Sequence, residues 1–207
     1  MFFILARPSF FASWTLLAVA ICVSSCAAQE KKIAEDEFLS STRAAWRSST
    51  NMFPRIETRE SITDDGATKI EQRSISATQY SLTRTVTANG ESHVTEFIRV
   101  EGKRYQRLDR GKWQSVTVEP DRSGKRAEPM AFAYFLTESV KNGEAVRKYR
   151  REDAGSGPVG FNETIEVDSK GRVVRETYNS RFGHGSITYQ FPENIDSITE
   201  PELARIN

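Results

Sequence analysis

Cysteine is almost absent from this chain of 207 residues, whose two cysteines, Cys22 and Cys26, both stand near the amino terminus. The residues after Cys26 therefore contain no disulfide, no cysteine-based zinc site and no thiol nucleophile. A small disulfide-stabilised fold is excluded for them. About 180 residues follow Cys26, which is enough for one domain held together by a hydrophobic core of ordinary size.

Histidine is also scarce, and no metal-binding or catalytic pattern accompanies it. His93 and His184 have no second ligand at the spacing of a metal site. His184 stands between two glycines and is interpreted as part of a surface turn rather than as a base for Ser186. The sequence has neither a Gly-x-Ser-x-Gly elbow nor a phosphate-binding glycine loop. We expect no metal, no cofactor and no catalysis; a hydrolase, which needs a nucleophile, a base and an orienting group in one cleft, is the least favoured alternative.

Neither sign of charge is in excess. One of the 29 basic residues, Arg7, lies in the first 25 residues, so 28 remain against 28 acidic residues. Proteins that bind nucleic acids usually carry a basic surplus, so no nucleic-acid partner is expected. The two signs are interspersed along the chain, which is typical of a solvated surface.

Long hydrophobic runs are confined to the amino terminus. Arg7 and Pro8 precede an apolar run from Phe10 to Val23, and small residues follow that run. This order is typical of a secretory signal peptide, which we place at residues 1–25. A transmembrane helix beginning at Phe2 is the alternative, but Arg7 and Pro8 interrupt it, and the run is shorter than the roughly 20 residues that a spanning helix needs.

The residues before Cys26 predict that this cysteine carries a lipid. Val23-Ser24-Ser25-Cys26 resembles the bacterial lipobox, in which an aliphatic residue and two small residues precede the cysteine that accepts a diacylglyceryl group. Residues 26–33 are then a lipidated tether, and stable anchoring follows from two or more acyl chains. Ala27 stands where an aspartate would favour the inner membrane, so we expect the outer membrane, facing the periplasm, in a Gram-negative cell. Ordinary cleavage after Ala28 is the alternative.

The region after the tether begins with a pattern typical of an amphipathic helix. Apolar positions recur at helical spacing at Phe38, Leu39, Thr42, Ala45 and Trp46. Acidic residues come first, at 35–37, and arginines come late, which suits the helix dipole. We expect the helix to end before Pro54.

From Arg55 onward the pattern changes to short strands separated by turns. The turn signals are Asp64-Asp65-Gly66, Asn89-Gly90, Glu101-Gly102, Arg110-Gly111 and Lys170-Gly171. Asn-Gly and Asp-Gly supply the positive φ angles of tight hairpins, so the series predicts a meander of antiparallel strands. Further strands are predicted at about 144–152, 161–168, 172–179 and 185–191, and two loose segments at 119–129 and 153–160.

Alternation gives most of these strands one apolar and one polar face. Leu82 and Val86 share one face, as do Val94 and Ile98 in the next strand. A charged residue, Arg84 or Glu96, interrupts each of these faces. We interpret the two as an ion pair across the strands or as part of a partly solvated face, and the alternative is a polar spot inside a cavity. The segment 130–140 (MAFAYFLTESV) ends before Gly143 and is predicted as a second helix inserted into the meander.

Three segments together resemble the outer-membrane lipoprotein carrier fold, a group that includes the periplasmic lipoprotein carrier, its receptor and mycobacterial lipid-carrying lipoproteins. They are FIRVEGKRYQRLDRGKWQSV at 97–116, IEVDSKGR at 165–172 and SITYQFP at 186–192. The resemblance implies an α+β fold over residues 34–207, in which a strongly curved antiparallel half-barrel is covered on its concave face by an N-terminal and an inserted helix. It also implies an apolar cavity for an acyl chain or a lipidated partner.

Carried onto this chain, the cavity would be lined by Leu82, Val86, Val94, Ile98, Phe135, Ile187 and Tyr189. Two interpretations remain open, because the same residues could form a filled core. The favoured function is a non-catalytic, lipid-anchored envelope protein that binds a hydrophobic ligand. The alternative is an interaction module that docks an envelope protein through its sheet and holds no ligand.

Overall fold

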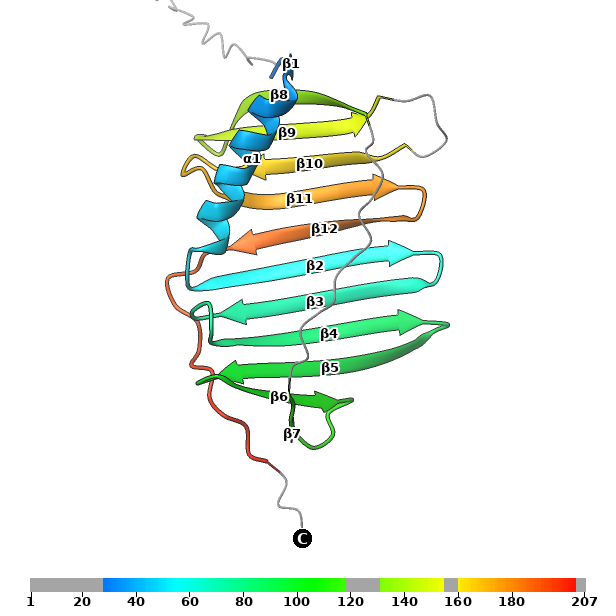
Figure 1. Ribbon diagram of the computed structural model, residues 1–207, viewed down its shortest axis with the longest axis vertical. Helices are drawn as coiled ribbons and strands as arrows, with labels where there is room; N and C mark the ends of the chain where they lie inside the picture. Colours follow the sequence, from blue (N-terminus) through cyan, green and yellow to red (C-terminus); the bar gives the residue numbers. More distant parts are fainter. Residues whose placement is uncertain (1–27, 118–130, 155–159, 204–207) are drawn as a thin grey trace, which may run out of the picture.

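The computed structural model describes residues 28–117, 131–154 and 160–203, which form one antiparallel sheet of twelve strands and one helix (Figure 1). The helix α1 spans Glu35–Thr50. The strands are β1 (Glu30–Ile33), β2 (Arg55–Thr63), β3 (Gly66–Ser74), β4 (Tyr80–Ala88), β5 (Glu91–Val100), β6 (Lys103–Leu108), β7 (Gln114–Ser115), β8 (Phe132–Lys141), β9 (Glu144–Asp153), β10 (Asn162–Val167), β11 (Val173–Ser180) and β12 (Gly183–Gln190).

The sheet is assembled from two meanders that meet at its centre. β2 to β7 follow one another in space, and so do β8 to β12; pairing of β12 with β2 joins the two series. The edges are β1, which pairs with β8, and β7, which pairs with β6. The predicted antiparallel meander is therefore confirmed, as an open sheet. The strong curvature of a half-barrel stays a prediction.

The hairpins form where the turn signals predicted them. Asn89 and Gly90, between β4 and β5, have φ angles of 54° and 81°, and Glu101 and Gly102, between β5 and β6, have 51° and 78°. Positive φ at both central residues matches the twist of a two-residue hairpin, which is why glycine is favoured there. Local turn chemistry thus fixes the register of this half of the sheet.

The helix α1 lies across β8 to β12, and among the described residues no helix covers the other meander (Figure 1). Its fully buried Phe38 packs against Tyr134 of β8 and Tyr149 of β9, with ring centroids 5.0 and 6.2 Å apart. Burial of a phenylalanine of this kind contributes about 1.5–3 kcal/mol. The predicted helix is confirmed. We call the face that α1 covers the inner face, and the opposite one the outer face.

The predicted second helix is wrong, because residues 132–141 form strand β8. Phe132, Tyr134 and Leu136 alternate onto the inner face, where Tyr134 is buried in the core. A short apolar run is compatible with either a helix or a buried strand, and the residues after it decide the outcome. Asn142 and Gly143 have φ angles of 53° and 81°, so they form a hairpin turn to β9 rather than a helix end.

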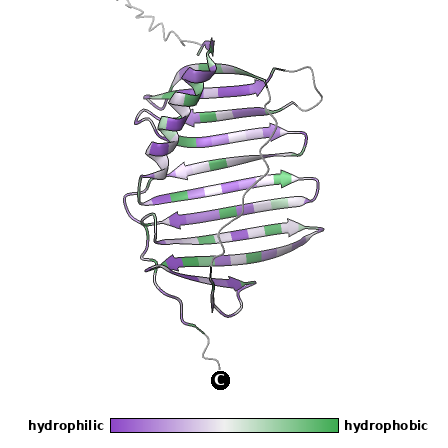
Figure 2. Cartoon of the chain, viewed as in Figure 1, coloured by the Kyte–Doolittle hydropathy of each residue, from purple (hydrophilic) through white to green (hydrophobic). Residues whose placement is uncertain are grey.

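A row of polar side chains crosses the outer face. One row of cross-strand neighbours from β8 to β6 contains only threonine and charged residues: Thr137, Lys148, Glu166, Arg175, Thr188, Thr58, Glu71, Thr83, Glu96 and Arg107. Oppositely charged neighbours pair within it, as Lys148 does with Glu166 at 3.2 Å. Hydrophilic and hydrophobic residues alternate along most strands (Figure 2), so each strand presents its apolar side chains mainly to one face.

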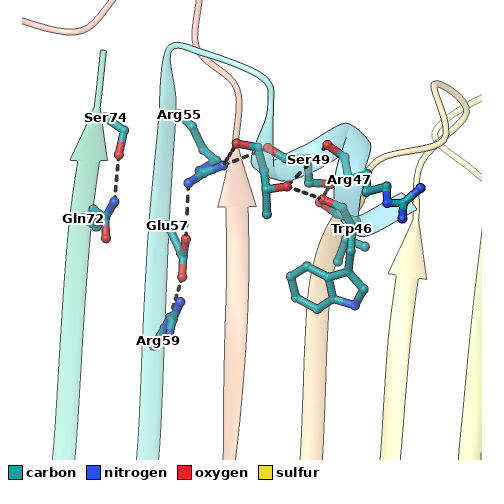
Figure 3. A network of polar contacts seen from close by, with 10 residues as sticks. Trp46, Arg47, Ser49, Arg55, Glu57, Arg59, Gln72 and Ser74 are labelled. Atoms are coloured by element: carbon teal, nitrogen blue, oxygen red, sulfur yellow. Dashed lines mark hydrogen bonds and ion pairs between the residues drawn. The ribbon is translucent and has the colours of Figure 1, made fainter. Parts of the chain in front are cut away.

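A polar network joins the end of α1 to the centre of the sheet (Figure 3). Arg55 of β2 donates hydrogen bonds from Nη1 to the carbonyl oxygens of Ser49 and Thr50, at 3.0 and 2.7 Å. Its Nη2 lies 3.8 Å from the carboxylate of buried Glu57, which also pairs with Arg59. The last carbonyls of a helix lack partners within it, so the guanidinium satisfies groups that would otherwise be buried without hydrogen bonds.

The carboxyl-terminal segment runs along the strand ends of the uncovered meander (Figure 1). The carbonyl oxygen of Ile198 accepts a hydrogen bond of 2.9 Å from Gln79, and Ile198 itself is buried. Lys103 lies 2.7 Å from Glu200, and this hydrogen bond holds the pKa of Glu200 below its usual value. The segment is therefore fixed to the β3–β4 turn and to β6.

Several predicted features lie outside the described residues. They are the signal peptide, Cys26, the segment 119–129 and most of 153–160. Within the described ranges, no helix is long and apolar enough to cross a membrane.

Candidate functional site

A groove lies on the inner face where α1 does not cover the sheet. Its volume is about 540 Å³, and its walls are formed by β3, β4, β5 and β6 together with Val116 and Thr117 after β7. Ligand pockets typically measure about 300–1,000 Å³. The groove is therefore large enough for a small molecule or an acyl chain.

The floor of the groove is apolar because the hairpin register aligns one apolar side chain from each of three strands. Leu82 of β4 lies directly opposite Phe97 of β5, and Ile70 of β3 lies one row further along, opposite Arg84. All three apolar side chains are partly exposed. In the other half of the same face, the corresponding side chains are covered by α1.

Arginines, without any acidic residue, supply the charge of the groove. Arg84, Arg99 and Arg104 line it, and among residues 28–117, 131–154 and 160–203 no aspartate or glutamate does so. Arg99 of β5 and Arg104 of β6 are directly opposite each other. Sequence reasoning singled out Arg84 as a charge among apolar neighbours but missed Arg99 and Arg104, because an arginine on an alternating strand looks the same whether it faces solvent or a groove.

The seven predicted cavity residues do not share one face. Leu82 lies in the groove, and Val86 is on the same face. Val94, Ile98 and Phe135 belong to the outer face, although Ile98 still contributes to the wall of the groove. The expectation that all seven residues lie on one face is wrong. Val86 is directly opposite His93, so both side chains are on the inner face, and Val94, the next residue along the strand, is on the outer face.

Ile187 and Tyr189 belong to the packed core beneath α1 rather than to the groove. Tyr189 is buried, and its ring meets Trp46 of α1 edge to face with centroids 5.6 Å apart. Burial raises the pKa of the Tyr189 hydroxyl well above its ordinary value. The interpretation of these residues as a filled core therefore holds for the half of the sheet formed by β8 to β12, and the groove lies in the half formed by β3 to β6.

The predicted ion pair between Arg84 and Glu96 is also wrong. Glu96 is directly opposite Thr83 and Arg107 on the outer face, and it accepts hydrogen bonds of 2.6 and 2.8 Å from Arg107. Arg84 is opposite Thr95 on the inner face. The two-residue turn at Asn89-Gly90 sets a register in which Arg84 and Glu96 lie on opposite faces, and the prediction failed because it grouped the apolar faces without applying that register.

A pair of carboxyl groups lies on the inner face in the helix-covered half. Arg151 Nε is 2.6 Å from the buried carboxylate of Glu163. Burial, followed by the charge of Glu163 and a hydrogen bond with it, raises the pKa of Glu176 to about 7. This pair can therefore share a proton near neutral pH, a property of structural as well as functional carboxyl pairs.

The two histidines lie on opposite faces of the sheet, His93 on the inner and His184 on the outer face, and are not brought together. His93 Nδ1 lies 3.1 Å from Asp109, whose pKa is lowered by a hydrogen bond from the backbone of Val94 and then by His93. His184 is in strand β12, opposite Ile62, so its interpretation as part of a turn is wrong. Among the described residues, no group of three or more potential metal ligands is present.

Comparisons with known proteins give a similarity in structure and none in sequence. No protein-family model matches the chain, and no curated protein is significantly similar to it in sequence. Among solved structures, the chain is similar to the lipoprotein LppX of Mycobacterium tuberculosis, with a TM-score of 0.45 and 15% sequence identity over 79% of this chain and 100% of LppX.

Proposed function

We propose that this protein is a non-catalytic envelope lipoprotein that binds a hydrophobic ligand in the groove on β3 to β6. One observation carries the proposal: α1 covers the inner face over one meander only, so that Ile70, Leu82 and Phe97 line an open groove over the other. Exposure of apolar side chains to water is unfavourable, and an apolar ligand would cover them.

The proposed anchor is a lipid on Cys26, supported by the apolar run from Phe10 to Val23 and the lipobox-like Val23-Ser24-Ser25 before it. An acyl anchor would hold the domain at a membrane without any membrane-binding surface on the sheet. The polar row on the outer face, with its ion pairs and threonines, agrees with such a role, and we place the domain on the periplasmic side of an outer membrane.

Native mass spectrometry of the chain from Gln29 onward tests the ligand. This chain retains every described strand and the helix. It is purified from a lipid-containing host, and bound molecules are extracted with solvent. The expected result is one lipid or fatty acid per chain. A mass without ligand that persists after incubation with fatty acids and phospholipids would contradict the proposal.

The anchor is tested separately with Cys26→Ser in the full chain, expressed in a Gram-negative host. The wild type should fractionate with membranes and carry an acylated amino-terminal cysteine in the mass spectrum. The variant should lose the acyl mass and leave the membrane fraction. Acylation at another site, or none in the wild type, would refute the anchor without affecting the groove.

The alternative function is docking of an envelope protein through the sheet. It is favoured by exposed apolar side chains at the strand ends, since Ile62 and Phe182 are 50% and 66% exposed. Cross-linking in the envelope of a strain that makes the protein would distinguish the two functions. A single specific partner together with a ligand-free groove would replace the ligand-binding proposal.

A further inference from the structure

Arg99 and Arg104 are placed side by side at one end of the groove. They are directly opposite each other on β5 and β6, and both side chains are partly buried on the inner face. Residues directly opposite in an antiparallel pair have Cβ atoms about 4.5–5.5 Å apart, and like charges in this position repel each other. A negative group placed between the two guanidinium groups would offset this repulsion.

No such group comes from the described part of the chain. No ion pair joins Arg99 or Arg104 to a carboxylate of residues 28–117, 131–154 or 160–203, whereas the neighbouring Arg107 forms two hydrogen bonds with Glu96. The buried Nε of Arg99 has no hydrogen-bond partner among these residues. A buried donor without a partner costs free energy, so the site favours an added acceptor.

The apolar floor begins next to this basic pair. Phe97 is two residues from Arg99 on β5 and therefore on the same face, and Leu82 lies opposite Phe97. Arg84 lies at the other end, four residues from Tyr80 on β4, which corresponds to about 13 Å along the strand. One anionic group therefore cannot contact Arg84 and the Arg99–Arg104 pair at the same time.

We infer that the ligand of this groove is an anionic amphiphile, whose carboxylate or phosphate binds between Arg99 and Arg104 while its hydrocarbon chain covers Leu82 and Phe97. The inference rests on the proposed function and adds the chemical class of the ligand. Guanidinium groups bind carboxylate and phosphate oxygens through two parallel hydrogen bonds, which gives both strength and orientation.

The test compares ligands that differ only in their head groups, using the chain from Gln29 onward. Palmitate and hexadecanol share a chain length, and lysophosphatidylglycerol and lysophosphatidylcholine share a glycerophosphate and differ in net charge. Each ligand displaces the neutral fluorescent probe N-phenyl-1-naphthylamine. We expect palmitate to bind at least about tenfold more tightly than hexadecanol, because hydrogen bonds to charged groups are strong. A similar preference for lysophosphatidylglycerol over lysophosphatidylcholine would identify a phosphate ligand.

The double variant Arg99→Gln/Arg104→Gln should lose this preference and still bind the probe. Arg175→Gln is the matched control, since Arg175 is exposed on the outer face of β11. Equal affinity of the wild type for palmitate and hexadecanol, with lysophosphatidylglycerol no tighter than lysophosphatidylcholine, would overturn this inference and leave the proposed function intact. Failure of the wild type to bind the probe and all four ligands would overturn both. The wild-type comparison decides the matter even if the double variant does not fold.

Discussion

Arg55 of β2 reaches the carbonyl oxygen of Ser49 in the last turn of α1, with 3.0 Å between Nη1 and the oxygen. This contact joins the helix to the strand at the middle of the sheet, where the two meanders meet. Ser49 in turn donates a hydrogen bond of 3.1 Å to the carbonyl oxygen of Val173 in β11. The end of α1 is thus held by both meanders, and its position determines where the covered half of the inner face ends.

Replacing Arg55 with methionine should destabilise the protein strongly. The variant keeps the length of the side chain but leaves the carbonyls of Ser49 and Thr50 and the carboxylate of Glu57 without the guanidinium. Removing one partner of a buried charged network costs about 3 kcal/mol. Urea unfolding monitored by circular dichroism measures the loss.

The matched control is Arg73→Met, because Arg73 pairs with Glu71 on the exposed outer face at 2.9 Å. Surface ion pairs of this kind contribute less than about 1 kcal/mol. Similar free energies of unfolding for the two variants would show that Arg55 contributes no more than an exposed arginine.

Substitution of Gly143 by alanine should destabilise the β8–β9 hairpin. Gly143 has a φ angle of 81°, in the left-handed region where an L-residue with a side chain is strained by about 1–2 kcal/mol. Gly160→Ala is the control, because Gly160 has no positive φ and nothing lies within 4 Å of an added Cβ. Thermal unfolding should separate the two variants; a loss of stability for Gly160→Ala alone would contradict the hairpin at residues 142–143.

Sequence reasoning predicted the strands correctly where a local turn defines the hairpin. It failed where the choice between helix and strand depends on residues outside the segment. Asn89-Gly90 and Glu101-Gly102 specify their hairpins by themselves. The run from Phe132 to Val140 is by itself compatible with a helix or a strand. The Asn142-Gly143 turn after it pairs it with β9, and β1 pairs with its other side.

The candidate site could be predicted only in part. Alternation correctly grouped Leu82 with Val86, but alternation alone does not give the face of Val94, which follows from the register of the Asn89-Gly90 hairpin. The groove itself arises because α1 is long enough to cover five strands and no more, a limit set by tertiary packing rather than by any pattern in β3 to β6.

The stability of the fold should fall as pH rises through about 7 because of Glu176. Its pKa is raised from 4.5 to about 7 in the folded state, so the folded protein binds the proton more tightly than the unfolded chain does. The stabilisation is fully present below pH 4.5 and is lost as the pH rises through the folded pKa. Solvent screening at this partly exposed carboxyl reduces the expected change to about 1–2 kcal/mol.

Glu176→Gln, which mimics the protonated carboxyl, should remove this dependence and raise the free energy of unfolding at pH 8 relative to wild type. Glu166→Gln is the control, since Glu166 pairs with Lys148 on the outer face. Urea titrations between pH 4 and pH 8.5 measure the effect. A wild-type stability that rises across this interval would contradict the raised pKa.

Filling the groove should abolish binding of a neutral apolar probe without unfolding the protein. Leu82→Trp adds bulk to a partly exposed floor residue, whereas Val94→Trp adds a tryptophan to the outer face of the adjacent strand. We expect N-phenyl-1-naphthylamine to bind the Val94 variant as it binds wild type, and to bind the Leu82 variant at least about tenfold more weakly, because the indole would occupy the apolar surface that the probe covers.

Fluorescence titration measures both affinities, and circular dichroism checks that both variants fold. Loss of binding in the Val94 variant alone would move the site to the outer face, and unchanged binding in both would show that the probe binds outside the groove.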